Sequence, residues 1–335
     1  MQAQHIAIEK YGPAQTLKVR PFQVRPPGDD EVAIDVAYSG VNFADVQMRL
    51  GFYPDAPPRP FVPGYEVAGR VAAVGRKVEG LAKGDPVAAG TYFGGYASSV
   101  TIPAAQVLPL PRELDLKHGA ALPVNFFTAQ VALFEMARVR AGDRVLVECA
   151  TGGVGVLAMQ MARRAGAEVT GLTTSPHKKS FIEGYGARAY TRDEFRADET
   201  LRGYDFILNA SGGVDLAWQR ARLGIGGRMV CIGLNSGVKE GRRNFARLAW
   251  AALRTPRIPV LRLFNENSGI FGLNALTVLR DPAWIARLRT AALERLGDGA
   301  PIAPHIGQVF PAAEAPAAHR FLETKQATGK VLLAW

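Results

Sequence analysis

Cysteine is nearly absent from this sequence. The chain has 335 residues and only two cysteines, Cys149 and Cys231. Two cysteines cannot build a disulfide framework or the four-cysteine lobe of a structural zinc site. Each lies inside an apolar, strand-like run, so we expect two buried and inert thiols.

Long apolar runs are also missing. No segment reaches the roughly 20 apolar residues that a membrane-spanning helix needs. The sequence begins MQAQHI, which lacks the basic and apolar stages of a secretion signal. We therefore expect a soluble, cytoplasmic protein.

Acidic residues are outnumbered by basic ones. The chain has 40 Lys and Arg against 30 Asp and Glu, a formal net charge of +10. Such an excess suits nucleic acid, membrane lipid or an anionic ligand. No nucleic-acid motif accompanies it and the arginines are scattered, so no nucleic-acid partner is expected. A phosphorylated cofactor and a high arginine content would account for most of the charge.

The first third of the chain is rich in Gly and Pro, with short β-branched runs between them. Examples are residues 31–36, 66–74 and 85–89. This pattern predicts a compact β domain of short strands.

From about Leu116 the pattern changes to strands that alternate with helices. Strands are expected at 144–149, 168–172, 204–208 and 227–232, and helices at 156–164 and 177–183. Alternation at this spacing predicts a parallel sheet covered on both faces. The tail (helices 281–296 and 314–324, strand 330–333) fits a return of the chain to the first domain.

A glycine-rich turn follows the strand expected at 144–149. It reads Ala150-Thr151-Gly152-Gly153-Val154-Gly155 and opens a helix. Gly152 lets the backbone approach a pyrophosphate, and Gly155 permits close packing of helix on strand. The free amides and the positive end of the helix dipole then receive the phosphates. Ala150 replaces the usual first glycine, so a turn that merely joins strand to helix is the alternative to dinucleotide binding.

The residues after the second strand distinguish NAD from NADP. An NAD site usually has an Asp or Glu there, which accepts from a ribose hydroxyl. Residues 173–179 read TTSPHKK instead and hold no carboxylate. Thr174, Ser175 and Lys178 are donors suited to a 2′-phosphate, although polar residues are also common at a solvated helix start. NADPH is the predicted cofactor.

Several ordered motifs carry a resemblance to a known family. They are SGVNFAD at 39–45, PGYEVAG at 63–69, KGD at 83–85, GGYA at 94–97, GAA at 119–121, the glycine loop, and ATGKVLL at 327–333. In these the chain resembles a zinc-independent medium-chain dehydrogenase/reductase of the quinone oxidoreductase (zeta-crystallin-like) group, along essentially its whole length. The longer region 237–271 resembles the vesicle amine transport protein-like branch.

The resemblance implies an α/β fold in two domains. A GroES-like, β-rich catalytic domain is expected at 1–123 and 266–335, and a Rossmann domain with a doubly wound parallel sheet at 124–265. Zinc-dependent relatives have a Cys where Asn42 stands and a His where Tyr65 stands, so no metal site is expected. Relatives of this kind commonly form homodimers.

The same resemblance implies which residues surround the cofactor. Those expected near the nicotinamide are Thr128, Gly233 and Leu234. A loop of Phe271, Gly272 and Leu273 is expected over the ring, and Lys330 is expected to reach the cofactor. Arg192 is the candidate neighbour of the adenosine phosphate. The family often has a Tyr-Arg pair there, and Tyr190-Thr191-Arg192 keeps only the Arg in place.

Asn42, Asp45 and Tyr53 form the candidate catalytic group. The stretch from Asn42 to Pro54 also resembles the enoyl reductase domains of polyketide synthases. Asn42 or Tyr53 can donate to a carbonyl oxygen as enolate charge develops. Tyr53 is the candidate proton donor, although an ordinary tyrosine pKa near 10 calls for help or a water relay. The alternatives are structural: Asn42 fixes a turn, Asp45 caps a helix or pairs with an arginine, and Tyr53 packs under the nicotinamide.

These residues predict an NADPH-dependent reductase of a small electrophilic molecule, namely a quinone, an enone or a 2-enoyl thioester. The alternative is an NADPH-binding protein of low turnover that works at a membrane surface or with a protein partner. The basic stretch 239–262 suggests a membrane-surface helix, but Pro256 and Pro259 interrupt it. A helix over the active-site mouth or at a subunit contact fits that stretch better.

Overall fold

A computed structural model describes residues 2–213, 215–233, 256–297, 302–324 and 326–335. The described residues fall into two compact units. The first is built from the ranges 2–124 and 276–335, and the second from 125–233 and 256–275.

The first unit is rich in β-structure. Antiparallel strands β1 (Gln2–Ala7) and β2 (Lys18–Gln23) form a ribbon, and a 7-stranded sheet has the order β14-β15-β3-β4-β5-β7 with β6 paired to β3. The strands of this sheet are β3 (Glu31–Val41), β4 (Glu66–Val74), β5 (Pro86–Gly90), β6 (Ser99–Pro103), β7 (Val107–Pro109), β14 (Ile306–Pro311) and β15 (Lys330–Ala334). Because β15 pairs antiparallel with β3, the end of the chain completes a sheet that the first third begins.

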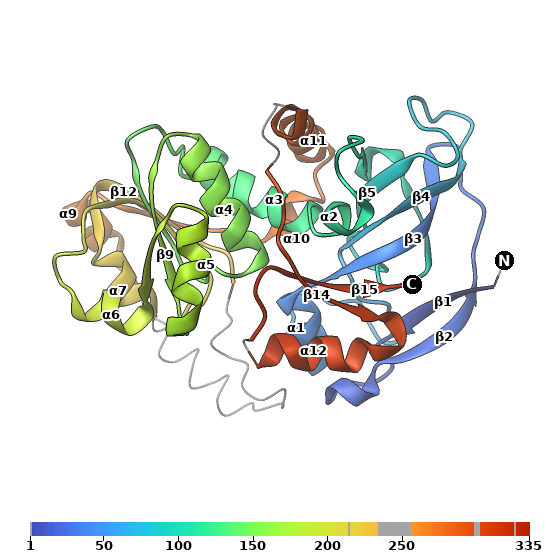
Figure 1. Cartoon of the computed structure of the whole chain (residues 1–335), viewed down its shortest axis with the longest axis horizontal. Coiled ribbons are helices and arrows are strands. Elements are labelled where there is room, and N and C mark those ends of the chain that lie inside the picture. Colours follow the sequence, from blue (N-terminus) through green and yellow to red (C-terminus); the bar gives the residue numbers. More distant parts are fainter. Residues whose placement is uncertain (1, 214, 234–255, 298–301, 325) are drawn as a thin grey trace. The chain divides into compact units, whose positions relative to one another are not determined.

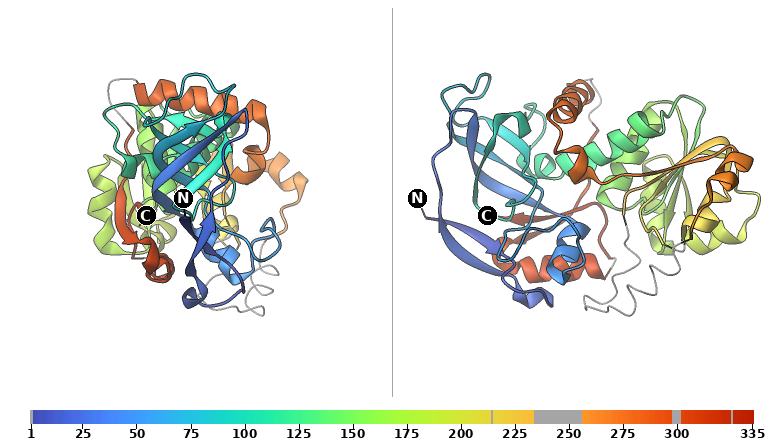
Figure 2. Two further views of the ribbon diagram at one scale, coloured as in Figure 1. Left: turned by 90° about the vertical axis from the view of Figure 1, so that its right-hand side faces the viewer. Right: turned by 180° about the vertical axis from the view of Figure 1, so that it is seen from behind.

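Four helices belong to this unit alone. They are α1 (Phe43–Leu50), α2 (Leu116–Ala120), α11 (Pro282–Gly297) and α12 (Ala315–Glu323). Helices α1 and α12 lie side by side in every view (Figures 1 and 2). They cover a core that includes Ile6, Met48, Tyr96 and Leu333.

The second unit is a six-stranded sheet in which every pair of neighbours is parallel. The order is β10-β9-β8-β11-β12-β13. The strands are β8 (Arg144–Val147), β9 (Glu168–Thr173), β10 (Arg188–Thr191), β11 (Tyr204–Asn209), β12 (Leu223–Cys231) and β13 (Gly269–Gly272). The chain runs from β8 outward to β10 and then returns to β11, so the strand order reverses between β8 and β11. In open parallel sheets, ligands bind outside the carboxyl ends of the strands at such a reversal.

Helices cover both faces of this sheet. Figure 1 shows α4 (Gly153–Arg164) and α5 (Lys179–Gly184) on one face, and α6 (Arg192–Ala197) and α7 (Asp215–Arg220) on the other. Among the described residues this unit also contains α9 (Val260–Glu266). Two further helices, α3 (Pro123–Gln130) and α10 (Ala275–Val278), begin at the boundary between the units, and a π-helical turn over Val131–Met136 continues α3.

The predicted fold class is confirmed, since a GroES-like unit and a parallel-sheet Rossmann unit are both present. One boundary differs from the expectation. Residues 266–275 were expected in the GroES-like domain, but β13 pairs with β12 and extends the Rossmann sheet. The chain therefore changes unit at 275/276.

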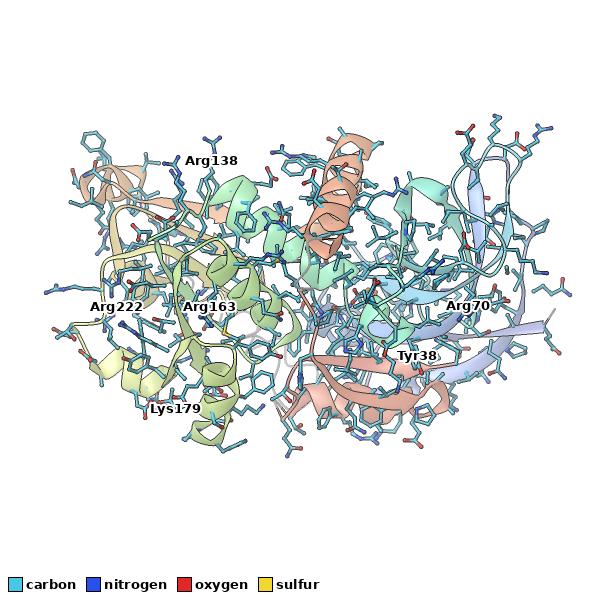
Figure 3. All side chains as sticks on the ribbon, turned by 45° about the horizontal axis from the view of Figure 1, so that its top comes forward. Tyr38, Arg70, Arg138, Arg163, Lys179 and Arg222 are labelled. Atoms are coloured by element: carbon cyan, nitrogen blue, oxygen red, sulfur yellow. The ribbon has the colours of Figure 1, made fainter. Side chains whose placement is uncertain are left out.

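Many arginines have structural roles. Arg70 donates to the Gly84 carbonyl, Arg163 to that of Tyr185, and Arg222 to those of Arg196 and Asp198, at distances of 2.5–3.0 Å (Figure 3). Part of the positive charge thus holds the chain's own carbonyl groups. Among the described residues, no helix is long and apolar enough to cross a membrane.

Candidate cofactor and substrate sites

The glycine loop connects β8 to α4 at the reversal of strand order. Gly152 is the N-cap of α4, and its N–H donates to the Cys149 carbonyl at 2.9 Å. A side chain at Gly155 would place its Cβ 2.4 Å from that same carbonyl oxygen, so only glycine fits there. The first N–H groups of α4 have no acceptor within the helix. The loop therefore suits the pyrophosphate of a dinucleotide.

The candidate 2′-phosphate residues follow β9, beside the glycine loop. The Ala150 N–H donates to the Leu172 carbonyl at 3.0 Å, which joins the loop to the end of β9. Thr174 is exposed and Ser175 is half-buried, whereas Lys178 is only 7% exposed. Burial lowers the pKa of Lys178. The neighbouring Lys179 pairs with Glu194 at 3.0 Å and is less available to a ligand.

Arg192 forms two ion pairs within the second unit. Its guanidinium lies between two carboxylates, 2.9 Å from Glu148 and 3.0 Å from Asp215. Both of these partners are buried. In the structure Arg192 therefore joins Glu148 to Asp215, and its contact with the adenosine phosphate stays a prediction.

Glu148 is the centre of that arrangement. It follows β8 directly, and its side chain is 1% exposed. Its carboxylate accepts from Arg192, from the Asn209 side chain, from the N–H of Ala210, and from both the N–H and hydroxyl of Ser211, at 2.7–3.2 Å. The Ser211 hydroxyl and the Trp218 indole also reach Asp215. One side chain thus joins the carboxyl ends of β8 and β11 to α6 and, through Asp215, to α7.

The nicotinamide-side residues of the second unit differ from expectation in one respect. Thr128 and Leu273 are buried, and the Leu273 N–H donates to the Cys231 carbonyl at 2.9 Å. Phe271 and Gly272 were expected in a loop, yet they lie in β13 because the ladder with β12 continues through Cys231. Gly233 follows β12 and is half-buried. Leu234 lies outside the described residues.

Asn42 and Lys330 meet in the first unit. The Lys330 ammonium donates to the Asn42 amide oxygen at 2.6 Å and forms an ion pair with Glu66. The Asn42 amide nitrogen donates to Glu66 at 3.1 Å, and Glu66 also accepts from the Val124 N–H at 2.8 Å. Lys330 and Glu66 are both buried. Lys330 and Glu66 thus orient Asn42, and the contact of Lys330 with the cofactor stays a prediction.

Asp45 is a buried helix cap. Its carboxylate accepts from the Asn42 N–H at 2.8 Å, from the Gly64 N–H at 3.1 Å and from the Tyr96 hydroxyl at 3.2 Å. Burial raises the pKa of Asp45 to about 7. Since these donors surround it, the structure supports the capping role that was the alternative to catalysis.

Tyr53 lies at one end of a chain of aromatic rings. Its ring centre is 6.3 Å from that of Tyr65, Tyr65 is 5.5 Å from Phe93, and Phe93 is 5.0 Å from Tyr92. The Tyr65 hydroxyl donates to the Met48 sulfur at 3.7 Å, and burial raises the pKa of both Tyr53 and Tyr65. Tyr53, Tyr92 and Phe93 are half-buried, so this cluster offers flat, partly exposed rings beside the candidate catalytic group.

Comparison with known proteins agrees with this geometry. The model of the alcohol dehydrogenase GroES-like domain matches residues 28–112, and that of the zinc-binding dehydrogenase matches 185–333. Quinone oxidoreductase of Sus scrofa is 30% identical over 98% of this chain and 96% of its own length. The synaptic vesicle membrane protein VAT-1 homolog of Rattus norvegicus is 31% identical over 95% of this chain and 80% of its own. The structure of the quinone oxidoreductase from Thermus thermophilus is 32% identical, covers both chains fully and has a TM-score of 0.81.

This chain belongs to the medium-chain dehydrogenase/reductase family. The predicted recognition of its quinone oxidoreductase group is confirmed.

The two cysteines of this medium-chain dehydrogenase/reductase are not alike. Both were expected to be buried. Cys149 is exposed, because the strand ends at Val147 and the residue belongs to the glycine loop. Cys231 is partly buried, and burial together with the Glu148 carboxylate raises its pKa to about 11.

Several residues of the site could not be chosen from the sequence. Glu148 carries one signal, a lone charge within the apolar run VLVEC at 145–149. Glu66 sits in the family motif PGYEVAG, but nothing local reveals its partner Lys330. Tyr92 and Phe93 show no periodicity. Across the described ranges, no group of three or more His, Cys, Asp or Glu side chains is arranged to hold a metal.

Proposed function

We propose that this protein binds NADPH on the loop at residues 150–155. The observation that carries the proposal is the pair of donors Ser175 and Lys178 at the carboxyl end of β9, beside that loop. Residues 173–179 include no Asp or Glu, so this segment has no carboxylate that would repel a 2′-phosphate. The related Thermus thermophilus quinone oxidoreductase was solved in a complex with NADPH, which supports the same cofactor here.

We propose further that the protein is a reductase of a quinone, an enone or a 2-enoyl thioester. Bound NADPH would supply the hydride. An amide group has two N–H donors, and Glu66 takes one from Asn42. The second is then available to a substrate carbonyl, where it would stabilise developing negative charge. Tyr53 keeps its proton at neutral pH and is the candidate donor of the proton that completes the reduction.

The reaction is proposed to need no metal. The Asn42 amide oxygen accepts from the Lys330 ammonium at 2.6 Å, and a cation placed at that oxygen would be repelled. Tyr65 is a buried phenol with a raised pKa, which makes it a poor metal ligand.

A second candidate function is low-turnover NADPH binding at a membrane surface. It is favoured by the relative named a synaptic vesicle membrane protein and by the exposed side chains of Val260, Leu261 and Phe264 on α9. Arg262, on the same helix, could approach anionic lipid.

One experiment separates the two candidates. The protein is mixed with NADPH and a panel of quinones, enones and 2-enoyl thioesters, and loss of NADPH absorbance is followed. Turnover supports the reductase. Tight NADPH binding and cosedimentation with anionic vesicles, without turnover of any acceptor, supports the second candidate and rejects the first. A cytoplasmic location and a homodimeric state remain predictions.

A further inference from the structure

Glu148 is buried at the carboxyl end of β8, two residues before the glycine loop where a cofactor is proposed to bind. Its carboxylate, Asp215 and the Arg192 guanidinium together leave one net negative charge near the glycine loop. A loop that receives a pyrophosphate would be better served electrostatically by a neutral group. The carboxylate must therefore supply something other than favourable charge.

The backbone directly after Glu148 is strained. Cys149 has φ +53°, in the left-handed region that non-glycine residues rarely adopt. Such a conformation is unfavourable for a residue with a side chain and persists where the surroundings fix it. Two contacts do so here: Glu148 is anchored on one side, and the Gly152 N–H holds the Cys149 carbonyl on the other.

That carbonyl also sets the shape of the loop. It receives the Gly152 N–H, and it lies where a Cβ at Gly155 would collide with it at 2.4 Å. If Cys149 relaxed to an ordinary φ, the carbonyl would turn away and the amides at the start of α4 would lose their arrangement. The conformation of one strained residue therefore connects Glu148 to the amides that would receive phosphate.

We propose that Glu148 is a positioning residue for the cofactor: by joining the ends of β8 and β11, it holds Cys149 left-handed and keeps the glycine loop open for the pyrophosphate. The inference rests on the proposed NADPH binding. Its contacts come from residues 192 and 209–211, so it acts through the backbone and touches no cofactor atom.

Glu148→Gln tests the inference, because the loss of negative charge and the loss of the anchoring contacts predict opposite changes in the Kd of NADPH. The amide removes the negative charge, which by electrostatics alone should strengthen the binding of NADPH. It also places an N–H against donors of Arg192 or Asn209, which loosens the anchor. We expect the Kd of NADPH, measured by calorimetry, to rise at least ten-fold. The Kd of NADH should rise by the same factor, because the 2′-phosphate residues are untouched, and kcat at saturating NADPH should stay within two-fold.

A second substitution tests whether Glu148 acts through the backbone conformation of Cys149. Glycine adopts a left-handed φ without strain, so Cys149→Gly in the Glu148→Gln protein should recover at least half of the lost affinity on a logarithmic scale. In the protein without cofactor, Glu148→Gln should speed hydrogen exchange of the loop amides at residues 150–155, and the double variant should slow it again. Glu168→Gln is the matched control, since it changes the same group at the exposed amino end of β9, away from the glycine loop, and it should leave NADPH binding unchanged.

These measurements distinguish failure of the proposed role of Glu148 from failure of the proposed NADPH binding. If the unaltered protein does not bind NADPH, the proposed function fails. If it binds, then unchanged or tighter binding in Glu148→Gln, or weaker binding that Cys149→Gly does not recover, overturns the inference. If Glu148→Gln does not fold, Ser211→Ala replaces it, because this substitution removes one donor to the Glu148 carboxylate. The inference then requires that Ser211→Ala raise the Kd of NADPH and the Kd of NADH equally, about three-fold.

Discussion

At the scale of single residues, buried polar groups organise the candidate substrate site. Asp45 joins the start of α1 to the loop at Gly64, while Glu66 and Lys330 fix the side chain of Asn42. Each of these groups is held by partners distant in sequence, and removing one partner would leave the others unsatisfied. The orientation of Asn42 thus depends on two buried residues, Glu66 and Lys330.

The ionisation of Asp45 should make stability depend on pH. Its pKa is raised to about 7 in the folded protein, against an ordinary value near 3.9 when unfolded. Between these values the folded state binds the extra proton, so this contribution to stability is full below about pH 4 and is lost as the pH rises to about 7. The Asp45→Asn variant lacks this titration.

We expect the free energy of unfolding of the unaltered protein, minus that of Asp45→Asn, to fall between pH 5 and pH 8. Urea titrations of both proteins at the two pH values measure it. A difference that stays constant or grows with pH would show that Asp45 does not titrate in this range.

Tyr53 is expected to act in the chemical step. Tyr53→Phe removes the candidate proton donor but keeps the ring that packs against Tyr65, so turnover should fall about ten-fold or more with little change in the Kd of NADPH. Tyr92→Phe removes a hydroxyl from the same aromatic cluster and serves as the control. Steady-state kinetics with an accepted quinone decide the matter, and unaltered turnover in Tyr53→Phe would remove Tyr53 from the mechanism.

At the scale of elements, the success of sequence reasoning follows from how local each signal is. The strand, glycine loop and helix from β8 through α4 were predictable, because apolar periodicity and glycine spacing lie within twenty or so residues. β13 was not, because four residues with two glycines show no alternation. The contacts of Glu148 were equally hidden, since its donors lie on elements brought together only by the folded sheet.

The edge strand β13 and helix α9 are the expected dimer contact. β13 pairs only with β12 among the described residues, and an edge strand can continue a sheet across a two-fold axis. Phe264 on α9 is 74% exposed. Burying such a ring is worth about 2 kcal/mol, so Phe264→Asp should weaken dimerisation roughly 30-fold.

Sedimentation velocity over a range of concentrations measures this effect. Val74→Asp, at an exposed apolar residue of the other unit, is the control and should leave the dimer intact. A monomeric unaltered protein, or a dimer indifferent to Phe264→Asp, would reject this contact.

At the scale of the whole molecule, the candidate substrate residues lie in one unit and the candidate cofactor residues in the other. The GroES-like unit carries the oriented Asn42 and the aromatic cluster from Tyr53 to Tyr92. The Rossmann unit carries the glycine loop, Ser175 and Lys178. The positive charge that first suggested an anionic partner is partly used on internal carbonyls and carboxylates, as with Arg163, Arg192 and Arg222. Lys178, at the carboxyl end of β9, is a cation of the proposed cofactor site.

We expect Lys178 to bind the 2′-phosphate of NADPH. A charge-assisted hydrogen bond is worth about 1.5–3 kcal/mol, so Lys178→Ala should raise the Kd of NADPH roughly 10- to 100-fold while the Kd of NADH changes little. Lys179→Ala, whose lysine already pairs with Glu194, is the control and should have a much smaller effect. Calorimetric titration of each protein with both nucleotides measures the preference for NADPH over NADH directly. We predict that the ratio of the Kd of NADH to the Kd of NADPH falls toward one in Lys178→Ala. If Lys178→Ala weakens the binding of NADPH and NADH equally, Lys178 does not bind the 2′-phosphate.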